Sequence, residues 1–293
     1  MIRRTLFTTL AAVSLVALVV PGTASARLAD VASRGWRTIP QRPAPAWATP
    51  DLHRQVVAAG AQGVALPSGA EADIPTSSLA FLGIRPGALM LIWSADGSTL
   101  SLCTSNFLFR SGDQYAIGTA GHCGNVGDDV DMVALPFGLV NIGKIIFSTG
   151  DRGVGDDFAL ASISPSLNPW VSPSMAHWGG PTGVYTGSGP APIVHSGWGL
   201  VIGTGGTPRA GLGMEWTSDE WRFIGAIVFG DSGSAANVTP SGLAAGNITH
   251  ISVDSRTLTT AAGTSIQKIL QLAGVPLATC ASAIPWPLPG CPA

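Results

Sequence analysis

The sequence predicts an all-β protein with one helix near its C-terminal end. From about residue 83 onward, short apolar runs alternate with turn residues, a spacing that is typical of a β-sandwich or barrel. The 293 residues include 38 glycines and 22 prolines, which together are too many for a helical bundle. A convincing helical pattern occurs only at 264–273.

Two sets of strand-length runs are expected. The first comprises Ala88–Trp93, Ser101–Phe109, Tyr115–Thr119, Asp131–Leu135, Leu139–Phe147 and Asp157–Ile163. Turn pairs such as Asp96-Gly97 and Gly150-Asp151 separate these runs. The second set extends from about Val184 to Val253 and is interrupted by glycine-rich turns.

The helical pattern covers Thr264–Ala273. Either Thr264 or Ser265 can cap it, apolar residues recur inside it at helical spacing, and Gly274 can end it. Five prolines then occupy residues 276–293, which we expect to form a proline-rich tail that a disulfide closes.

The N-terminal residues 1–26 are typical of a secretory signal peptide. Arg3 and Arg4 precede the apolar run Leu6–Val20, and Ala24-Ser25-Ala26 provides a cleavage pattern. A membrane anchor is the alternative, but the run is shorter than the roughly 20 residues that span a bilayer. We therefore expect a secreted protein, outside the membrane after signal cleavage.

The next segment, residues 27–82, differs in composition from the rest of the chain. Prolines and arginines crowd it, which predicts a loosely structured N-terminal extension or a propeptide. The strand pattern begins at about Gly83.

Composition excludes several classes of function. The apolar fraction is 46% and only 11% of residues are charged, so the chain is not mainly disordered. The formal net charge of -2 is not basic enough to predict a nucleic-acid partner. We expect no metal or cofactor, because the sequence offers no complete metal-ligand spacing and no phosphate-binding loop. We also expect a monomer.

Four cysteines are present, and in an exported protein they are expected to pair. Three pairings are possible, of which the local ones, Cys103–Cys123 and Cys280–Cys291, are favoured. The first closes a loop of about 20 residues, which stabilises the fold by about 3 kcal/mol. A zinc site is the alternative, but it lacks the usual Cys-x-x-Cys spacing.

Three short segments predict chemistry together, namely Thr119–Cys123, Gly155–Leu160 and Gly230–Ser234. A serine is a poor nucleophile unless a base such as histidine removes its proton. A carboxylate holds that histidine in one tautomer, and tightly turned backbone N–H groups stabilise the oxyanion of the intermediate. The segments supply these groups in the order His, Asp, Ser.

The segments resemble motifs of the chymotrypsin-like (trypsin-like) serine proteases, particularly the compact secreted bacterial members. Thr119–Cys123 resembles Thr-Ala-Ala-His-Cys, Asp157–Leu160 resembles an Asp-apolar-Ala-Leu strand, and Gly230–Ser234 resembles Gly-Asp-Ser-Gly-Gly. Gly246–His250 is similar to the strand along which substrate backbone lies. The resemblance covers about residues 83–275 and implies two six-stranded antiparallel β-barrels with the site in the cleft between them.

The resemblance implies a role for each matching residue. His122 acts as the general base, Asp157 rather than Asp156 orients it, and Ser232 is the nucleophile. The N–H groups of Gly230 and Ser232 form the oxyanion hole. The expected function is that of a secreted serine endopeptidase, which hydrolyses polypeptides through an acyl-enzyme intermediate.

Some positions depart from the pattern of the family. Gly121 replaces an alanine, Ser234 replaces a glycine, and His250 replaces a tryptophan. No Ile-Val-Gly-Gly start follows a basic residue, so the sequence leaves Asp231 without an evident charge partner. Cys103 resembles the partner of the half-cystine beside the catalytic histidine.

The expected substrate-binding residues are Ala226, Thr249 and His250. Ala226 lies six residues before the nucleophile, at the position that resembles the base of the specificity pocket, and it carries no charge. We therefore expect an apolar side chain before the cut bond. A protonated His250 that selects an acidic side chain is the alternative.

Two other functions are compatible with the motifs. One is an inactive protease homologue that uses the cleft only for binding. The other is an esterase, although the usual esterase elbow is Gly-x-Ser-x-Gly and here the fifth residue is Ser234. The usual esterase order, Ser, Asp, His, is also the reverse of the order found here.

Overall fold

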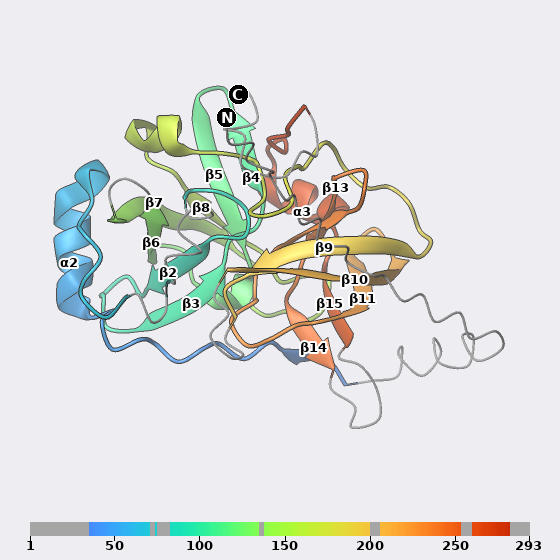
Figure 1. The fold of residues 1–293 in the computed structure, drawn as a ribbon, viewed down its shortest axis with the longest axis horizontal. Coiled ribbons are helices and arrows are strands. Elements are labelled where there is room, and N and C mark those ends of the chain that lie inside the picture. The colour runs from blue at the N-terminus through green and yellow to red at the C-terminus, as the bar shows by residue number, and fades with distance from the viewer. Residues whose placement is uncertain are drawn as a thin grey trace, which may run out of the picture. The chain divides into compact units, whose positions relative to one another are not determined.

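The computed structural model describes residues 35–70, 74, 83–134, 138–199, 206–252 and 260–281. The predicted signal peptide at 1–26 lies outside the described residues, as does Cys291. All the elements below belong to the compact unit Trp36–Ala293. They are almost entirely antiparallel strands, which Figure 1 shows as two groups of arrows.

The first sheet has seven strands in the order β3-β2-β6-β7-β8-β5-β4. Their bounds are β2 (Leu89–Trp93), β3 (Leu100–Thr104), β4 (Leu108–Ser111), β5 (Gln114–Thr119), β6 (Asp129–Ala134), β7 (Gly138–Ser148) and β8 (Ala159–Ser162). β3 and β4 stand at opposite ends of this order, yet only residues 105–107 separate them in the chain. The sheet therefore closes on itself as a barrel, here called the first barrel.

The run expected at Ser101–Phe109 is thus divided between β3 and β4. The hydroxyl of Ser105 donates to the carbonyl oxygen of Arg85 at 2.6 Å, and the side chain of Asn106 accepts from the N–H of Phe107 at 2.6 Å. These bonds between side chains and backbone, the second of them local, interrupt the strand ladder and turn the chain at the closure of the barrel.

The second sheet has eight strands in the order β1-β14-β15-β11-β10-β9-β12-β13. Their bounds are β1 (Arg37–Thr38), β9 (Ala191–Gly197), β10 (Thr207–Trp216), β11 (Glu220–Gly225), β12 (Ala235–Val238), β13 (Leu243–Asn247), β14 (His250–Ser252) and β15 (Thr260–Thr264). Only residues 248 and 249 separate β13 from β14, although these two strands lie near opposite ends of the order. This second barrel therefore closes in the same way, and β1 is added at its edge.

These observations confirm the predicted fold class. If β3 with β4 and β13 with β14 are each counted as one run, each barrel contains six antiparallel runs, and β1 is an addition from the N-terminal segment. Inward-facing apolar side chains fill both barrels. Fully buried examples are Met90, Ile117 and Ile142 in the first barrel and Ile193, Trp221 and Ala236 in the second.

The C-terminal helix is also present, as α3 (Ile266–Ala273). It begins two residues later than expected because Thr264 belongs to β15. Ser265 caps the helix by accepting from the N–H of Lys268 at 3.2 Å. Gly274 ends it in the left-handed conformation at φ 66°, which favours glycine.

A second helix, α2 (Pro50–Ala59), lies where the sequence predicted a loosely structured extension. Thr49 caps it, and Val56 packs in one cluster with Leu91 of the first barrel. On the same helix, His53 contacts Asp131 through Nδ1 and Oδ2, 2.7 Å apart in the interior. Residues 50–62 are therefore an ordered part of the protein rather than a loose one.

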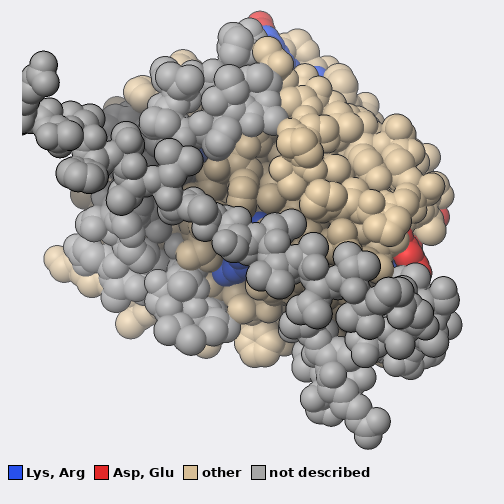
Figure 2. Space-filling model, turned by 45° about the vertical axis from the view of Figure 1, so that its right-hand side comes forward, with Lys and Arg blue, Asp and Glu red and all other residues tan. Residues whose placement is uncertain are grey.

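Short 3-10 helices complete the described elements. They are η1 (Gly60–Gln62), η4 (Gly121–Cys123) and η5 (Pro165–Trp170). No helix within the described ranges has both the length and the apolar character needed to cross a bilayer. On the described part of the face in Figure 2, blue and red atoms form small, separate spots, in keeping with a sequence in which 11% of residues are charged.

Candidate active site

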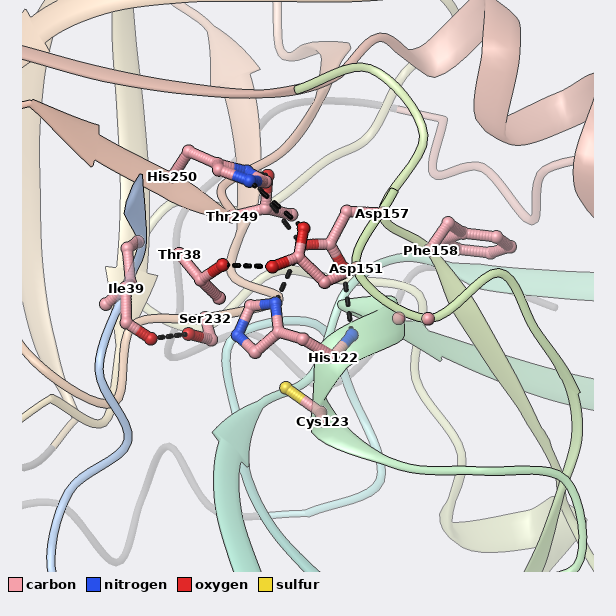
Figure 3. A network of polar contacts seen from close by, with 12 residues as sticks. Thr38, Ile39, His122, Cys123, Asp151, Asp157, Phe158, Ser232, Thr249 and His250 are labelled. Carbon is pink, nitrogen blue, oxygen red and sulfur yellow. Dashed lines mark hydrogen bonds and ion pairs between the residues drawn. The ribbon is translucent and has the colours of Figure 1, made fainter. Parts of the chain in front are cut away.

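The three sequence motifs meet between the two barrels. His122 lies in η4, directly after β5, and Asp157 lies just before β8, so both come from the first barrel. Ser232 lies in the loop between β11 and β12 of the second barrel. Figure 3 shows the imidazole of His122 with Asp157 on one side and Ser232 on the other.

The aspartate holds the histidine at two points. Oδ2 of Asp157 lies 2.7 Å from Nδ1 of His122, and Oδ1 accepts the backbone N–H of the same histidine at 3.0 Å. Asp157 has no exposed surface, and only 8% of the His122 side chain is exposed. The ring orientation is therefore fixed, with Nε2 directed away from the carboxylate.

Two polar residues of the second barrel hold the backbone of Asp157. The side-chain amide of Asn247 donates to the carbonyl oxygen of Asp157 at 2.9 Å, and the hydroxyl of Thr264 accepts its N–H at 3.2 Å. Asn247 and Thr264 are themselves joined, because the Thr264 N–H donates to the Asn247 side chain at 2.8 Å. The sequence placed Asn247 in the substrate-strand motif and Thr264 at the helix start, but it predicted neither contact with Asp157, because both contacts join the two barrels.

The loop that carries His122 is packed tightly. A Cβ atom at Gly121 would lie 2.4 Å from the carbonyl oxygen of Gly150 and 2.9 Å from the backbone nitrogen of Phe158. Glycine in place of the family's alanine is therefore required here by space. Cys123 forms the predicted disulfide with Cys103. The Cys280–Cys291 pairing involves a residue outside the described ranges and stays a prediction.

Ser232 is fully buried, and its hydroxyl is not directed to the histidine. It donates instead to the carbonyl oxygen of Ile39 at 3.2 Å. Nε2 of His122 is buried and makes no hydrogen bond with any described residue. The carbonyl oxygen of Ser232 accepts from the N–H of Thr104 at 2.8 Å, which ties the serine loop to the first barrel.

Gly230 adopts a backbone conformation that favours glycine, with φ 94°. Its N–H, one of the two expected oxyanion donors, donates to the carbonyl oxygen of Pro40 at 3.2 Å. The hydroxyl of Thr104 donates to the carbonyl oxygen of Gly230 at 3.0 Å and fixes this turn from the first barrel.

The structure supplies the charge partner that the sequence did not provide for Asp231. The guanidinium of Arg209, on β10, forms a buried ion pair with this carboxylate. The carboxylate also accepts the backbone N–H of Gly199 at 3.0 Å and that of Val228 at 2.9 Å. Burial raises the pKa of Asp231, while Arg209 and these N–H groups oppose that change. Arg209 was missed because nothing in the local sequence links it to Asp231.

His250 lies close to the carboxylate of Asp157. Its Nδ1 is 2.8 Å from the hydroxyl of Thr249 and 3.8 Å from Oδ2 of Asp157. Its Nε2 is 3.4 Å from Oδ1 of Asp151. Burial lowers the pKa of His250, although the two nearby carboxylates oppose this.

Within the described part of the chain, two groups of side chains bring possible metal-ligating atoms together at this site. Ligand atoms of Asp151, Asp157 and His250 all lie within 4.8 Å of one another. Asp157 is engaged by His122, and both nitrogens of His250 already face polar partners. Among the described residues, the other grouping of this kind consists of His122 and the disulfide-bonded Cys103 and Cys123, whose sulfurs are not free to bind a metal.

The expected substrate-binding residues lie in different environments. Thr249 and His250 are buried at the start of β14, whereas Ala226 is exposed. The next residue, Ile227, is 6% exposed and belongs to the apolar cluster of the second barrel. A cavity of about 360 Å³ is lined by His122 together with Ile92 and Asn125.

Comparison with known proteins gives likenesses only among solved structures, since neither a protein-family model nor a curated protein matches the sequence. Thermobifida fusca Protease A is 20% identical, with 67% of this chain and 98% of that chain covered at a TM-score of 0.45. Nocardiopsis Protease is 19% identical, with coverages of 67% and 99% and a TM-score of 0.47. Cellulomonas bogoriensis chymotrypsin is 20% identical, with coverages of 67% and 98% and a TM-score of 0.45. At these values the function must be argued from the geometry of the site itself.

Proposed function

We propose that the chain is a secreted serine endopeptidase of the chymotrypsin-like type. The observation that carries this proposal is the contact between His122 and Asp157 at 2.7 Å, with Ser232 on the opposite side of the same imidazole. A base-activated serine requires a buried carboxylate on one ring nitrogen and the serine on the side of the other, so that its hydroxyl can turn to the imidazole.

In the proposed reaction, Nε2 of His122 takes the proton of Ser232 as the hydroxyl attacks a peptide carbonyl carbon. The oxyanion that forms accepts the N–H groups of Gly230 and Ser232. His122 then gives the proton to the leaving amine, and water hydrolyses the acyl-enzyme by the same steps. Asp157 stabilises the imidazolium throughout.

The test measures hydrolysis of an unstructured polypeptide and of a simple ester. Both the full chain and its Ile39→Asp variant are assayed, because the carbonyl oxygen of Ile39 binds the Ser232 hydroxyl in this structure. We expect peptide cleavage that Ser232→Ala and His122→Ala abolish and that Ser166→Ala, at an exposed serine, leaves unchanged. Cleavage of the ester alone would favour an esterase. Absence of any Ser232-dependent cleavage would contradict the proposal.

A further inference from the structure

An N-terminal segment, residues 37–42, lies where the proposed peptidase would hold its substrate. Strand β1 of this segment pairs antiparallel with β14, and Thr38 stands opposite His250. The next residue, Ile39, donates its backbone N–H to the carbonyl oxygen of Thr249 at 2.9 Å. An extended peptide that adds a strand to a sheet edge is bound through such backbone pairs.

The side chain of Ile39 is buried in the second barrel. It is 0% exposed and belongs to the cluster that contains Ile227, Trp221 and Ile251. An aliphatic side chain is thus enclosed by apolar groups directly beside the serine loop. This position therefore suits an aliphatic residue and offers no charged partner within the cluster.

The contacts on both sides of Ile39 hold the segment in place. The guanidinium of Arg222 lies 5.7 Å from the ring centroid of Trp36, and the hydroxyl of Thr38 donates to Asp151. Beyond the serine, Arg42 is only 4% exposed and donates to the carbonyl oxygen of Trp198 at 3.4 Å. The segment is therefore bound along its length rather than at one point.

The bond that faces Ser232 is not arranged for cleavage. In acyl transfer, the serine oxygen faces the carbonyl carbon while the oxygen of the same carbonyl accepts from the oxyanion donors. Here the hydroxyl of Ser232 donates to the oxygen of Ile39, and the N–H of Gly230 is bound to the next carbonyl, that of Pro40. Figure 3 shows the bond between Ser232 and Ile39. The segment therefore occupies both the nucleophile and an oxyanion donor without being positioned for attack.

We propose that residues 37–42 are a built-in inhibitor of this site. Peptides that compete with this segment for the site are extended chains that carry an aliphatic residue at the position of Ile39. The inference rests on the proposed peptidase function, because inhibition requires an activity to inhibit. Binding of residues 37–42 at the site is a separate property, which can be measured without any activity.

The first measurement compares the full chain with Ile39→Asp, which places a charge in the apolar cluster and loosens the segment. The matched control is Gln41→Asp, which adds the same charge at an exposed position of the same segment. We expect fluorophosphonate labelling of Ile39→Asp to be at least about tenfold faster than that of the full chain, equivalent to about 1.4 kcal/mol. Gln41→Asp stays close to the full chain, and Ile39→Ala, which adds no charge, is intermediate.

The second measurement does not depend on activity. Hydrogen exchange should show protection at the backbone N–H of Ile39 in the full chain and in Ser232→Ala, and its loss in Ile39→Asp. Protection of Ile39 without fluorophosphonate labelling of any variant would contradict the peptidase, but it would support the binding of residues 37–42 at the site. If the segment were unprotected and the full chain were labelled as fast as Ile39→Asp, the inhibitor proposal would be contradicted and the peptidase proposal would be unaffected.

A peptide added in trans identifies the ligand class. The probe is a synthetic peptide with the sequence of residues 35–43, and its control has aspartate at the place of Ile39. We expect the first peptide to inhibit Ile39→Asp competitively and the second to inhibit at least about tenfold more weakly. Equal inhibition by the two would contradict the aliphatic pocket.

Discussion

The hydroxyl of Ser232 donates to the carbonyl oxygen of Ile39 at 3.2 Å, although the two residues are 193 positions apart in the chain. The same proton would be the one that His122 removes during catalysis. Because it is engaged elsewhere, Nε2 of His122 makes no hydrogen bond with any described residue. Departure of Ile39 frees the hydroxyl to turn toward the imidazole.

Replacement of the orienting carboxylate should be severe. Asp157→Asn removes one acceptor from Nδ1 of His122 and allows the wrong tautomer, so kcat should fall by about 10⁴. Asp156→Asn should change kcat less than about threefold, because that side chain is 37% exposed and pairs at 3.9 Å with Arg152, which is itself exposed. Peptide hydrolysis by the two variants checks this, and the reverse ranking would move the orienting role to Asp156.

A single methyl group should disturb the histidine loop. Gly121→Ala brings a Cβ to 2.4 Å from a backbone oxygen, so the loop must shift and His122 with it. We expect a loss of stability of about 1–3 kcal/mol and a clear fall in peptide hydrolysis. The matched control is Gly189→Ala, where a Cβ meets no atom within 4 Å. If both variants unfolded at the same urea concentration as the parent, the loop would not be packed as described.

The ion pair beneath the serine loop should be important for stability. Arg209→Leu leaves the carboxylate of Asp231 buried without its partner, which should cost about 3–5 kcal/mol. Arg209→Leu combined with Asp231→Asn should recover part of this loss. Lys144→Leu is the control, because Lys144 pairs with Asp129 at 2.8 Å but is 54% exposed and should cost at most about 1 kcal/mol. Urea unfolding measures all three, and equal losses for Arg209 and Lys144 would contradict a buried pair.

Stability should fall at acid pH because of His195. Burial, and then the charge of Arg209, lower the pKa of this histidine from 6.5 to about 3. Between these values the unfolded chain binds more protons than the folded one, so the free energy of unfolding rises with pH. The stability that the neutral, buried His195 provides is fully present above about pH 6.5. It is lost as the pH falls toward 3, by up to about 1.4 kcal/mol per pH unit. His195→Phe should flatten this slope in urea unfolding, and an unchanged slope would assign it to other groups.

The sequence predicted an all-β fold and the chemical motifs because both depend on local patterns, whereas the two six-stranded barrels were implied by the resemblance to chymotrypsin-like proteases. Strand-length apolar runs predict β-strands, and the residue types around His122, Asp157 and Ser232 are the ones that the proposed chemistry requires. Helix α2 had a local signal that the prolines obscured. Thr49 before Pro50 is a good helix start, and Gly60 provides an end.

Other features depend on contacts between distant parts of the chain. β1 has only two residues and is stabilised by pairing with β14, so its own sequence carries no strand signal. The pairing of Arg209 with Asp231 and the hold of Asn247 on Asp157 require the two ends of each contact to be brought together by the barrels. Local patterns in the sequence cannot locate such partners.

The most direct test of the central claim is the site of covalent labelling by a fluorophosphonate, mapped by mass spectrometry in the full chain and in Ile39→Asp. We predict one adduct, on Ser232, that is lost in His122→Ala and forms faster in Ile39→Asp. Labelling that persists in His122→Ala, that lies on another residue, or that is absent from both forms would contradict a histidine-activated serine at this site.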